Sequence, residues 1–449
     1  MTHPPRITVI GTGYLGATQA VCMAHLGFEV VAVDVDPGKI DALASGRLPF
    51  YEPGLDTLRV DTLATGRLRF TTDFALAAEF GDVHFVCVGT PQSAGSDAAD
   101  LRYVDAAFTA LASSISRRAL VVGKSTVPVG TAERLAQLVR EVSPAGAELE
   151  LAWNPEFLRE GHAVEDTLRP DRLVFGVESA WAEEMLREAY APIIDAGAPV
   201  VVADLATSEL VKVAANSFLA TKISFINAMA EVCEATGADV SLLASALSYD
   251  DRIGGRFLKP GLGFGGGCLP KDIRAFRARA EELGVSSAVS FLHEVDQINL
   301  RRRSRTVDLV REMVGDDLHG VRVAALGAAF KPDSDDVRDA PALDVARLLY
   351  LAGARVVVFD PKANDNAHRM YPDLDYAASF PEAISGADVV LLLTEWREFT
   401  TADPEDMGVL VAHRRIVDGR GALDVQRYRA AGWEYRALGR PAEVGLARI

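Results

Sequence analysis

Short apolar runs alternate with stretches of helical character over residues 1–203. The runs cover residues 6–10, 29–33, 82–88, 119–124 and 150–153. Runs of this length, bounded by glycine, proline or hydroxyl residues, are typical of strands that are buried on both faces of a parallel sheet. The pattern therefore predicts a doubly wound α/β domain in the first part of the chain.

The middle of the chain has a different pattern, in which two long helical stretches cover residues 204–236 and 286–314. The first is rich in alanine, and the second carries apolar residues at Val289, Leu292, Val295 and Ile298. Three consecutive arginines at positions 301–303 interrupt the second stretch. We interpret them as a solvated or interface face rather than a nucleic-acid patch, because acidic residues outnumber basic ones in this chain.

A second α/β pattern follows Gly320. Its predicted strands cover residues 321–326, 355–359, 387–393 and 415–417, and a helix is predicted over 343–351. A chain of 449 residues is long enough for two or three domains. We therefore expect an α/β protein with two Rossmann-like doubly wound domains, at residues 1–203 and 317–449. A helical central domain with a long connecting helix, at residues 204–316, is expected to join them.

The first apolar run is followed by the sequence GTGYLG at residues 11–16, then by a helical stretch and a second run that ends at Asp34. This order of strand, glycine turn, helix, strand and acid predicts a dinucleotide site with the pyrophosphate at the helix N-terminus. A carboxylate at Asp34 accepts hydrogen bonds from ribose hydroxyls and repels a 2′-phosphate. The sequence therefore predicts NAD rather than NADP as the cofactor.

The second α/β pattern lacks this glycine spacing, because its first turn has the sequence GAAFKP at residues 327–332. A Rossmann-like domain without the pyrophosphate motif is expected to bind a different ligand. Lys331, Arg338 and Arg420 place cations near its predicted strand ends. Such groups suit a phosphate or a nucleotide.

The sequence GLGFGGGCLPKD at residues 261–272 places one cysteine between a glycine run and a predicted helix. Pro270 suits the first turn, so Cys268 would lie just ahead of the positive end of the helix dipole, where a thiolate is favoured. Asp272 would oppose this effect. Glycines at 265–267 would let backbone N–H groups and a substrate approach the sulfur. The alternative is a flexible loop with an incidental cysteine, since most cysteines are inert.

Polar side chains follow several of the predicted strands. Thr90 and Thr126 lie in turns after two of them, and Glu156 and Glu160 follow a third. Ligands bind at the carboxyl ends of the strands in an open parallel sheet. The threonines could equally serve turn formation, and the glutamates could be solvated.

Lys212 and Asn216 lie four residues apart on one face of the predicted helix over residues 204–236. Val211, Val213 and neighbouring alanines indicate that this face is at least partly buried. A buried lysine needs a partner or a function. The alternative is a lysine whose aliphatic chain lets its ammonium group reach solvent.

Composition excludes several classes of function. The net charge of −17 argues against sequence-independent binding to nucleic acid or to an anionic membrane. The four cysteines (Cys22, Cys87, Cys233 and Cys268) have neither CxxC nor Cys/His spacing, so we expect no metal site and no disulfide framework. The N-terminus has no signal-like region and no apolar stretch is long enough to span a membrane, so we expect a cytoplasmic protein.

Seven motifs together resemble those of the nucleotide-sugar dehydrogenases, the UDP-glucose/GDP-mannose dehydrogenase family. They are GTGYLG, VCVGTP, GKSTVPVGT, NPEFLREG, the helix with Lys212 and Asn216, RIGGRFLKPGLGFGGGCLPKD and AFKPDSDDVRDAP. Their order and spacing over nearly the whole chain are far more specific than any one of them. Two positions depart from the family pattern: Gly267 stands where relatives often have serine, and Gly421 where many have a polar or basic residue.

The resemblance implies an NAD-dependent, four-electron oxidation of UDP-glucose to UDP-glucuronate. Cys268 would be the nucleophile, forming a thiohemiacetal and then a thioester. Lys212 and Asn216 would stabilise the oxyanion. By the same resemblance, Asp272 and Thr126 would position the catalytic water and the lysine, while Glu156 would be the general base for hydrolysis.

The resemblance also implies the binding residues. Those expected to hold NAD are Gly11, Gly13, Tyr14, Leu15, Gly16, Asp34, Lys39, Thr90, Thr126, Glu160, Lys271 and Arg338. Those expected to hold the nucleotide sugar are Glu156, Phe157, Leu158, Arg159, Lys212, Asn216, Arg252, Phe257, Leu258, Lys259, Gly265, Phe330, Lys331 and Arg420. Arg252 would reach across a homodimer interface formed by the middle helices.

Three alternatives remain from the sequence. The substrate could be another nucleotide sugar, such as GDP-mannose or a UDP-N-acetylhexosamine. A single-step hydroxyacid dehydrogenase would share the N-terminal fold, but it would need neither Cys268 nor a complete third domain. A catalytically silent sensor of NAD or nucleotide sugar would bind without turnover, although the sequence shows no lost nucleophile or base.

Overall fold

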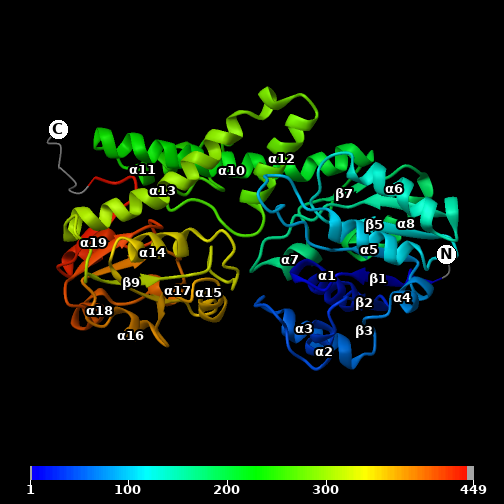
Figure 1. The fold of residues 1–449 in the computed structure, drawn as a ribbon, viewed down its shortest axis with the longest axis horizontal. Coiled ribbons are helices and arrows are strands. Elements are labelled where there is room, and N and C mark those ends of the chain that lie inside the picture. Colours follow the sequence, from blue (N-terminus) through cyan, green and yellow to red (C-terminus); the bar gives the residue numbers. More distant parts are fainter. Residues whose placement is uncertain (1–2, 442–449) are drawn as a thin grey trace. The chain divides into compact units, whose positions relative to one another are not determined.

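The computed structural model describes residues 3–441, which fall into two compact units. Unit 1 comprises residues 1–215 and 274–285, and unit 2 comprises residues 216–273 and 286–449, in each case as far as they are described. Each unit is built around its own sheet (Figure 1). Two helices, α10 (Leu205–Thr236) and α12 (Leu269–Glu282), contribute residues to both units.

The sheet of unit 1 has eight strands in the order β3-β2-β1-β4-β5-β6-β7-β8. Their bounds are β1 Ile7–Ile10, β2 Val30–Val33, β3 Leu68–Thr71, β4 Val83–Val86, β5 Ala119–Gly123, β6 Leu149–Trp153, β7 Leu173–Gly176 and β8 Val200–Ala203. All neighbours are parallel except β6 and β7. The strand order reverses between β1 and β4, and such a switch point opens a crevice for ligands at the carboxyl ends of the strands.

Helices cover both faces of this sheet, as the doubly wound pattern predicts. Their bounds are α1 Tyr14–His25, α2 Pro37–Ala44, α3 Leu55–Ala64, α4 Phe74–Phe80, α5 Arg102–Ala112, α6 Thr131–Val142, α7 Ala163–Leu168, α8 Ala180–Ala189 and α9 Ala191–Asp195. Because successive strand residues point to opposite faces, Ile7 and Val9 pack in one core cluster and Ile10 in the other. Both clusters are continuous across β1, β4 and β5.

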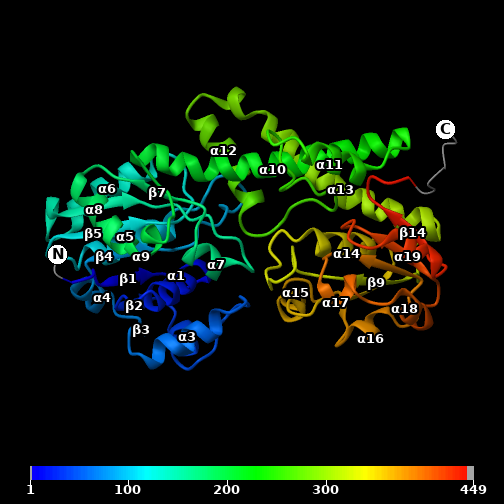
Figure 2. The same cartoon turned by 180° about the vertical axis from the view of Figure 1, so that it is seen from behind.

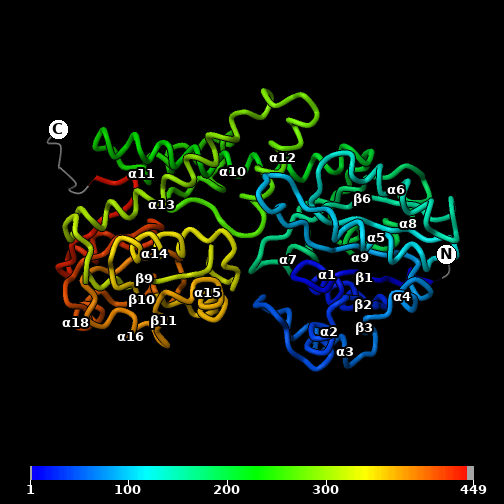
Figure 3. Tube along the Cα trace, in the orientation of Figure 1, coloured from blue at the N-terminus to red at the C-terminus, as the bar shows by residue number. Residues whose placement is uncertain are grey.

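The sheet of unit 2 has six parallel strands in the order β11-β10-β9-β12-β13-β14. Their bounds are β9 Arg322–Leu326, β10 Arg355–Phe359, β11 Asp375–Tyr376, β12 Val389–Leu392, β13 Arg415–Asp418 and β14 Glu434–Ala437. Figure 3 shows β9, β10 and β11 side by side. The flanking helices are α14 Pro341–Leu351, α15 Asn364–Met370, α16 Phe380–Ile384, α17 Arg397–Thr400, α18 Pro404–Leu410 and α19 Val425–Ala430. The prediction of two α/β sheets is confirmed.

Unit 2 also contains α11 (Val240–Ser248), α13 (Phe291–Val314) and the C-terminal part of α10. In this unit α10 and α13 lie side by side, as both views show (Figures 1 and 2). The hydroxyl of Ser224 on α10 donates to the carbonyl of Val295 on α13 at 2.7 Å, and both partners are buried. Within the described residues no helix is both long enough and apolar enough to cross a membrane.

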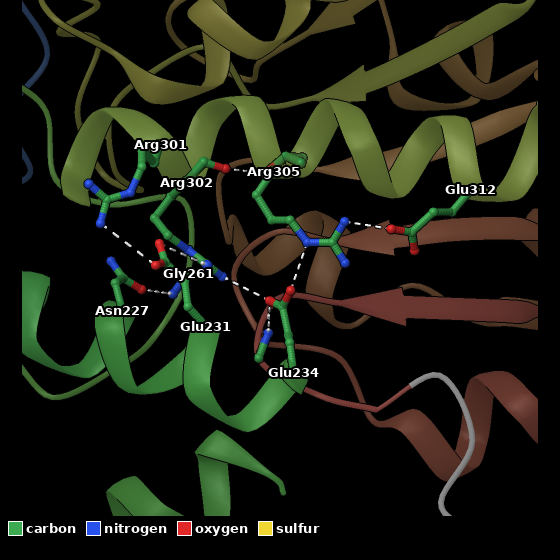
Figure 4. Close-up of polar contacts among 10 residues, drawn as sticks. Asn227, Glu231, Glu234, Gly261, Arg301, Arg302, Arg305 and Glu312 are labelled. Atoms are coloured by element: carbon green, nitrogen blue, oxygen red, sulfur yellow. Dashed lines mark hydrogen bonds and ion pairs between the residues drawn. The ribbon is translucent and has the colours of Figure 1, made fainter. Parts of the chain in front are cut away.

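The expectation of a solvated or interface face on α13 is wrong for two of its three arginines, which are buried within the chain. Arg301 is exposed, but Arg302 is fully buried and Arg303 is 4% exposed. Arg302 pairs with Glu234 of α10, at 3.2 Å (Figure 4), and Arg303 pairs with Asp344 of α14. Consecutive helical residues point about 100° apart, so three in a row cannot share one solvated face.

Candidate active site

The turn after β1 forms a cradle that lacks side chains. Gly11 has φ +90°, a conformation that favours glycine, and a Cβ at Gly16 would lie 1.7 Å from the carbonyl oxygen of Gly11. Gly13 is the N-cap of α1 and has open space where a Cβ would point. No side chain caps this helix N-terminus. The turn therefore fits a pyrophosphate bound by the backbone N–H groups of α1.

Asp34 follows β2 and is anchored toward the glycine turn. Its Oδ2 accepts hydrogen bonds from the backbone N–H of Thr12 at 2.7 Å and from the hydroxyl of Thr12 at 3.0 Å. Lys39 Nζ lies 3.7 Å from the same oxygen. Burial pushes the pKa of Asp34 up, but these hydrogen bonds and the Lys39 charge outweigh it and hold the pKa below its usual value. A fixed carboxylate here suits a ribose diol.

Glu52 is a functional candidate that the sequence reasoning missed. It is 4% exposed and accepts the backbone N–H groups of Gly161 and Ala163, each at 2.7 Å. The hydroxyl of Tyr14, in the glycine turn, donates to the same carboxylate. Burial and the Glu52 carboxylate raise the pKa of Tyr14. Glu52 thus ties the glycine turn to the loop that carries Glu156, a link that no sequence spacing reveals.

Glu156 and Lys212 meet inside unit 1. Glu156 Oε1 lies 3.0 Å from Lys212 Nζ, and the lysine is 4% exposed. The ammonium also lies 5.5 Å from the centroid of the Phe157 ring, whose centroid is 3.8 Å from the guanidinium carbon of Arg172. Neither alternative, a solvated glutamate or a lysine that reaches solvent, holds. A buried cation paired with one carboxylate can stabilise negative charge or exchange a proton.

The threonines after β4 and β5 lie next to each other. The hydroxyl of Thr90 donates to the carbonyl of Thr126 at 2.8 Å. Nearby, Glu209 of α10 accepts the backbone N–H groups of Gly130 and Ala132 at 2.8 and 2.7 Å, at the start of α6. Burial raises the pKa of Glu209 to about 7 against the opposing effect of these hydrogen bonds.

Cys268 lies immediately before α12 and is exposed, whereas the other three cysteines are buried. In the first turn of α12, Asp272 is 2% exposed and accepts a hydrogen bond from Asn216 Nδ2 at 2.6 Å. Its other oxygen lies 2.5 Å from Lys271 Nζ. Cys268, Asn216, Lys271 and Asp272 are therefore brought together in unit 2. Burial raises the pKa of the Cys87 thiol to about 12, which leaves that cysteine a poor nucleophile.

The three glycines before Cys268 also allow close packing of the neighbouring loop. A Cβ at Gly265 would lie 2.3 Å from the carbonyl oxygen of Asp339, and one at Gly266 would lie 2.9 Å from the Phe330 ring. A Cβ at Gly267 would lie 2.3 Å from the guanidinium carbon of Arg338. The loop between β9 and α14 thus fills the spaces beside the glycines and places the Arg338 guanidinium next to the residue that precedes Cys268.

Arg420 follows β13 and is held by Glu395, another residue that the sequence reasoning missed. The two side chains meet at 2.6 Å. Burial pushes the pKa of Glu395 up, but Arg420 and, more weakly, Lys259 outweigh it, so the pKa is lowered. Arg420 and Lys259 therefore share one acidic neighbour, and Lys331 Nζ lies 5.4 Å from the centroid of the Phe330 ring.

The remaining residues that were predicted to hold the nucleotide sugar differ in their exposure and in their partners. Arg159 pairs with Asp166 of α7, and Arg252 is strongly exposed and pairs with Asp250. Phe257 has φ +63°, an uncommon conformation for a bulky residue. Leu258 packs in a hydrophobic cluster, so only its backbone is available to a ligand.

Among the described residues no group of three or more His, Cys, Asp or Glu could hold a metal ion.

Comparison with protein families matches three consecutive segments. The NAD binding domain of the UDP-glucose/GDP-mannose dehydrogenase family matches residues 5–194. The central domain of the same family matches residues 206–301, and its UDP binding domain matches residues 324–425. The matches fall in the order that the sequence predicts for a dinucleotide domain, a helical region and a second nucleotide domain.

Individual proteins are similar over nearly the full length. A UDP-glucose 6-dehydrogenase of Rhizobium meliloti (strain 1021) is 42% identical over 97% of this chain and 100% of its own. The structure of a UDP-glucose dehydrogenase from Pyrobaculum islandicum has TM-score 0.89 and 38% identity, covering 98% of both chains. That of a UDP-D-ManNAc dehydrogenase from Pyrococcus horikoshii has TM-score 0.84 and 27% identity, covering 97% of this chain and 99% of its own.

Proposed function

The chain belongs to the UDP-glucose/GDP-mannose dehydrogenase family and is an NAD-dependent oxidoreductase, and we propose that it oxidises UDP-glucose to UDP-glucuronate. The observation that carries this substrate is the 42% identity, over the full length, to a UDP-glucose 6-dehydrogenase. The similarity to a dehydrogenase of a UDP-N-acetylated sugar is lower, at 27%. GDP-mannose and UDP-N-acetylhexosamines are the rival substrates.

NAD would supply the hydride acceptor, with one NAD molecule used for each of the two hydrides that leave C6 of the sugar. The residues that would hold it begin with the glycine turn at Gly11, Gly13 and Gly16, where Tyr14 and Leu15 open α1. Asp34 would receive the ribose hydroxyls. Around them we place Lys39, Thr90, Thr126, Glu160, Lys271 and Arg338.

Cys268 is the proposed nucleophile for the second oxidation. An aldehyde carbon has no further hydride to give until a group adds to it, so the thiolate adds to form a thiohemiacetal. Loss of a hydride from that adduct gives a thioester. Water then attacks the thioester carbonyl, the C–S bond breaks, and the thiolate returns as the carboxylate leaves. The exposed position ahead of α12 favours this role, because a helix N-terminus stabilises a thiolate.

Lys212 and Asn216 are proposed to stabilise the negative charge on the sugar C6 oxygen. Lys212 is already buried and paired with Glu156, so its charge is fixed before the oxyanion forms. Glu156 would take a proton from the water that attacks the thioester. Asp272 holds Asn216 by a hydrogen bond and so positions it, and Thr126 is assigned a similar supporting role.

The diphosphate of the nucleotide sugar is proposed to contact cations of unit 2. Arg420, Lys259 and Lys331 offer cations to the diphosphate, and Phe330 offers a flat apolar surface. The other residues assigned to the sugar nucleotide are Glu156, Phe157, Leu158, Arg159, Arg252, Phe257, Leu258 and Gly265.

The decisive test is the amount of NADH formed per nucleotide sugar consumed. Purified protein is given UDP-glucose, UDP-N-acetylglucosamine, UDP-N-acetylmannosamine and GDP-mannose in turn. Two NADH with UDP-glucose alone is the expected result. Two NADH with a different sugar would support the proposed double oxidation and would show that the proposed substrate is wrong. One NADH per sugar would exclude the thioester step. Binding without NADH would indicate a sensor.

We also propose that two copies of the chain pair through the central helices. Phe218, Phe225 and Val232 follow one another at seven-residue spacing on α10 and are about half to two-thirds exposed. Leu242 and Tyr249 add a further exposed apolar surface at α11. An exposed stripe of this kind marks an interface, and a second copy would cover it with the same residues.

Light scattering after size exclusion tests this pairing. The wild type is expected to run as a dimer, and Phe218→Asp together with Phe225→Asp is expected to shift it toward a monomer. Val409→Asp serves as a control, because Val409 is an exposed apolar residue of α18, outside the central helices. A monomeric wild type would contradict the proposal and would leave Arg252 without a role across an interface.

A further inference from the structure

Two buried asparagines hold the glycine-rich loop before Cys268 by its backbone. Asn299 of α13 accepts the N–H of Phe264 at 2.7 Å and donates to the carbonyl of the same residue at 2.9 Å. Asn227 of α10 accepts the N–H of Gly261 at 2.9 Å (Figure 4). Both asparagines are fully buried. The loop is thus attached at two points, one to each long helix.

The loop backbone is shaped to receive Asn299. Gly263 has φ +96°, and a Cβ there would lie 2.1 Å from Asn299 Oδ1. A side chain at this position would both strain the backbone and displace the amide. The hydrogen bonds of Asn299 involve both polar atoms of its side chain, so rotation of the amide group would break both of them.

The opposite side of the loop is held by the segment between β9 and α14. The N–H of Gly266 donates to the carbonyl of Arg338 at 2.9 Å, and the ring of Phe330 fills the space beside Gly266. The loop therefore lies between the central helices and the C-terminal sheet domain, with contacts that are mostly to its backbone. A backbone held on both sides leaves the cysteine at its end few positions to sample.

We propose that Asn227 and Asn299 are positioning residues for Cys268. Their hydrogen bonds hold the backbone of the loop that leads to Cys268 and to the N-terminus of α12. The proposal rests on the role of Cys268 as the nucleophile. Removal of either amide would leave a buried backbone group without its partner and loosen the loop. A displacement of about 1 Å at a nucleophile can cost on the order of 100-fold in rate.

Ser224 supplies a matched control for both asparagines. It joins the same two helices through its buried hydrogen bond to Val295, but this bond does not involve the loop. Ser224→Ala therefore removes one buried hydrogen bond between α10 and α13 and leaves the attachments of the loop in place. A merely structural role for the asparagines predicts that all three substitutions behave alike.

The first experiment measures alkylation of Cys268 by iodoacetamide between pH 6 and 10, followed by mass spectrometry of the native protein. The other cysteines are buried, so the native reaction reports on Cys268. In Asn299→Ala and Asn227→Ala the pH midpoint of the rate is expected to rise, with a threefold to tenfold slower reaction near pH 7. Ser224→Ala is expected to react like the wild type. Identical profiles in all four proteins would overturn the proposal.

The second experiment compares kcat with the KM for NAD. Asn299→Ala is expected to lower kcat on the order of 10- to 100-fold, and Asn227→Ala somewhat less, because it makes one bond to the loop rather than two. The KM for NAD is expected to stay within about twofold, since the glycine turn lies in unit 1. Thermal unfolding of all three variants shows whether a lower kcat comes from unfolding or from displacement of Cys268 in a folded protein. Equal kcat losses in Ser224→Ala and Asn299→Ala would contradict a positioning role.

These outcomes are distinct from failure of the proposed reaction. The alkylation profile depends on the thiolate fraction and the accessibility of Cys268 and needs no turnover, so it tests the asparagines even if no sugar is oxidised. Conversely, a wild type that forms no NADH from UDP-glucose would refute the proposed substrate and leave the alkylation result unchanged. If Asn299→Ala does not fold, Asn227→Ala still tests the proposal.

Discussion

The two α/β sheets of this protein begin in the same way. In each, the first strand is followed directly by a glycine with positive φ, Gly11 at +90° and Gly327 at +112°. Each glycine donates its N–H to the last residue of the second strand, at 2.7 and 2.8 Å. Each second strand is then followed by an aspartate, Asp34 or Asp360, that accepts backbone N–H groups from the turn.

The two sheets share this glycine and this aspartate, but they differ in the segments that follow. Helix α1 begins at Tyr14, directly after the glycine turn, whereas α14 begins only at Pro341. Asp360 accepts backbone N–H groups from both sides and the indole N–H of Trp396, so its carboxylate is saturated by the protein itself. Within the described part of the chain, Asp34 accepts hydrogen bonds from Thr12 and Asp36, and Lys39 lies beside it. Asp360 therefore has more hydrogen-bond partners within the protein than Asp34 has.

The largest effect is expected at Cys268 of unit 2, the proposed nucleophile, and it should leave the proposed NAD site of unit 1 unchanged. Cys268→Ser is expected to lower formation of the carboxylate on the order of 10³-fold or more, because a hydroxyl is a far weaker nucleophile at neutral pH. NAD binding in unit 1 should not change. Mass spectrometry of the products and calorimetric titration with NAD measure the two. Full acid production by this variant would exclude the covalent route.

Asp360→Ala tests whether the second aspartate is structural. The substitution leaves several buried N–H groups without an acceptor, so the free energy of unfolding should fall by about 3 kcal/mol. Chemical denaturation measures that loss. Steady-state kinetics of the folded fraction should show an unchanged KM for NAD. A raised KM would contradict a purely structural role for Asp360.

Asp34→Ala is the counterpart in unit 1. The preference for NAD over NADP should fall by about tenfold, the value of one charge-assisted hydrogen bond. The melting temperature should change less than in Asp360→Ala, because fewer backbone groups depend on Asp34. The ratio of kcat/KM for the two cofactors is the measurement. An unmoved ratio would place Asp34 away from the ribose.

Glu52→Gln is expected to have a smaller effect. The amide would present N–H groups toward backbone N–H donors, so at least one of the hydrogen bonds to Gly161 and Ala163 is lost. We expect kcat/KM for NAD to fall about fivefold through displacement of the loop that carries Glu156. Glu79→Gln, at an exposed position of α4, is the control and should behave like the wild type.

The smallest effect is on the pH dependence of stability. Burial raises the pKa of Glu209 to about 7, whereas an unfolded chain releases that proton near pH 4.5. The folded state therefore binds more protons between these values, and the contribution of Glu209 to stability is lost as pH rises from 4.5 to 7. Glu209→Gln should remove most of the fall in the free energy of urea unfolding between pH 4.5 and 7. The control is Glu184→Gln, at an exposed position of α8, which should leave that pH dependence unchanged.

The positions of most central strands were predictable because buried parallel strands are continuous apolar runs. The strands that the pattern missed include β3 and β8, which lie at the two edges of the first sheet and are only partly buried. Edge strands carry exposed positions, so their sequences lack a clear apolar run. The buried Arg302 and Arg303 were missed because sequence spacing does not show which helix α13 faces.

The sequence alone determined the dinucleotide turn, the acid after the second strand and the cysteine at the start of a helix. Each depends on local backbone chemistry: glycines permit one turn, and a helix begins where proline fits. Only the tertiary structure showed which side chains these functional candidates contact. The pairing of Glu156 with Lys212, the role of Glu52 and the attachment of the Cys268 loop to Asn227 and Asn299 join residues far apart in the chain. Such contacts depend on how the elements pack, which no local pattern records.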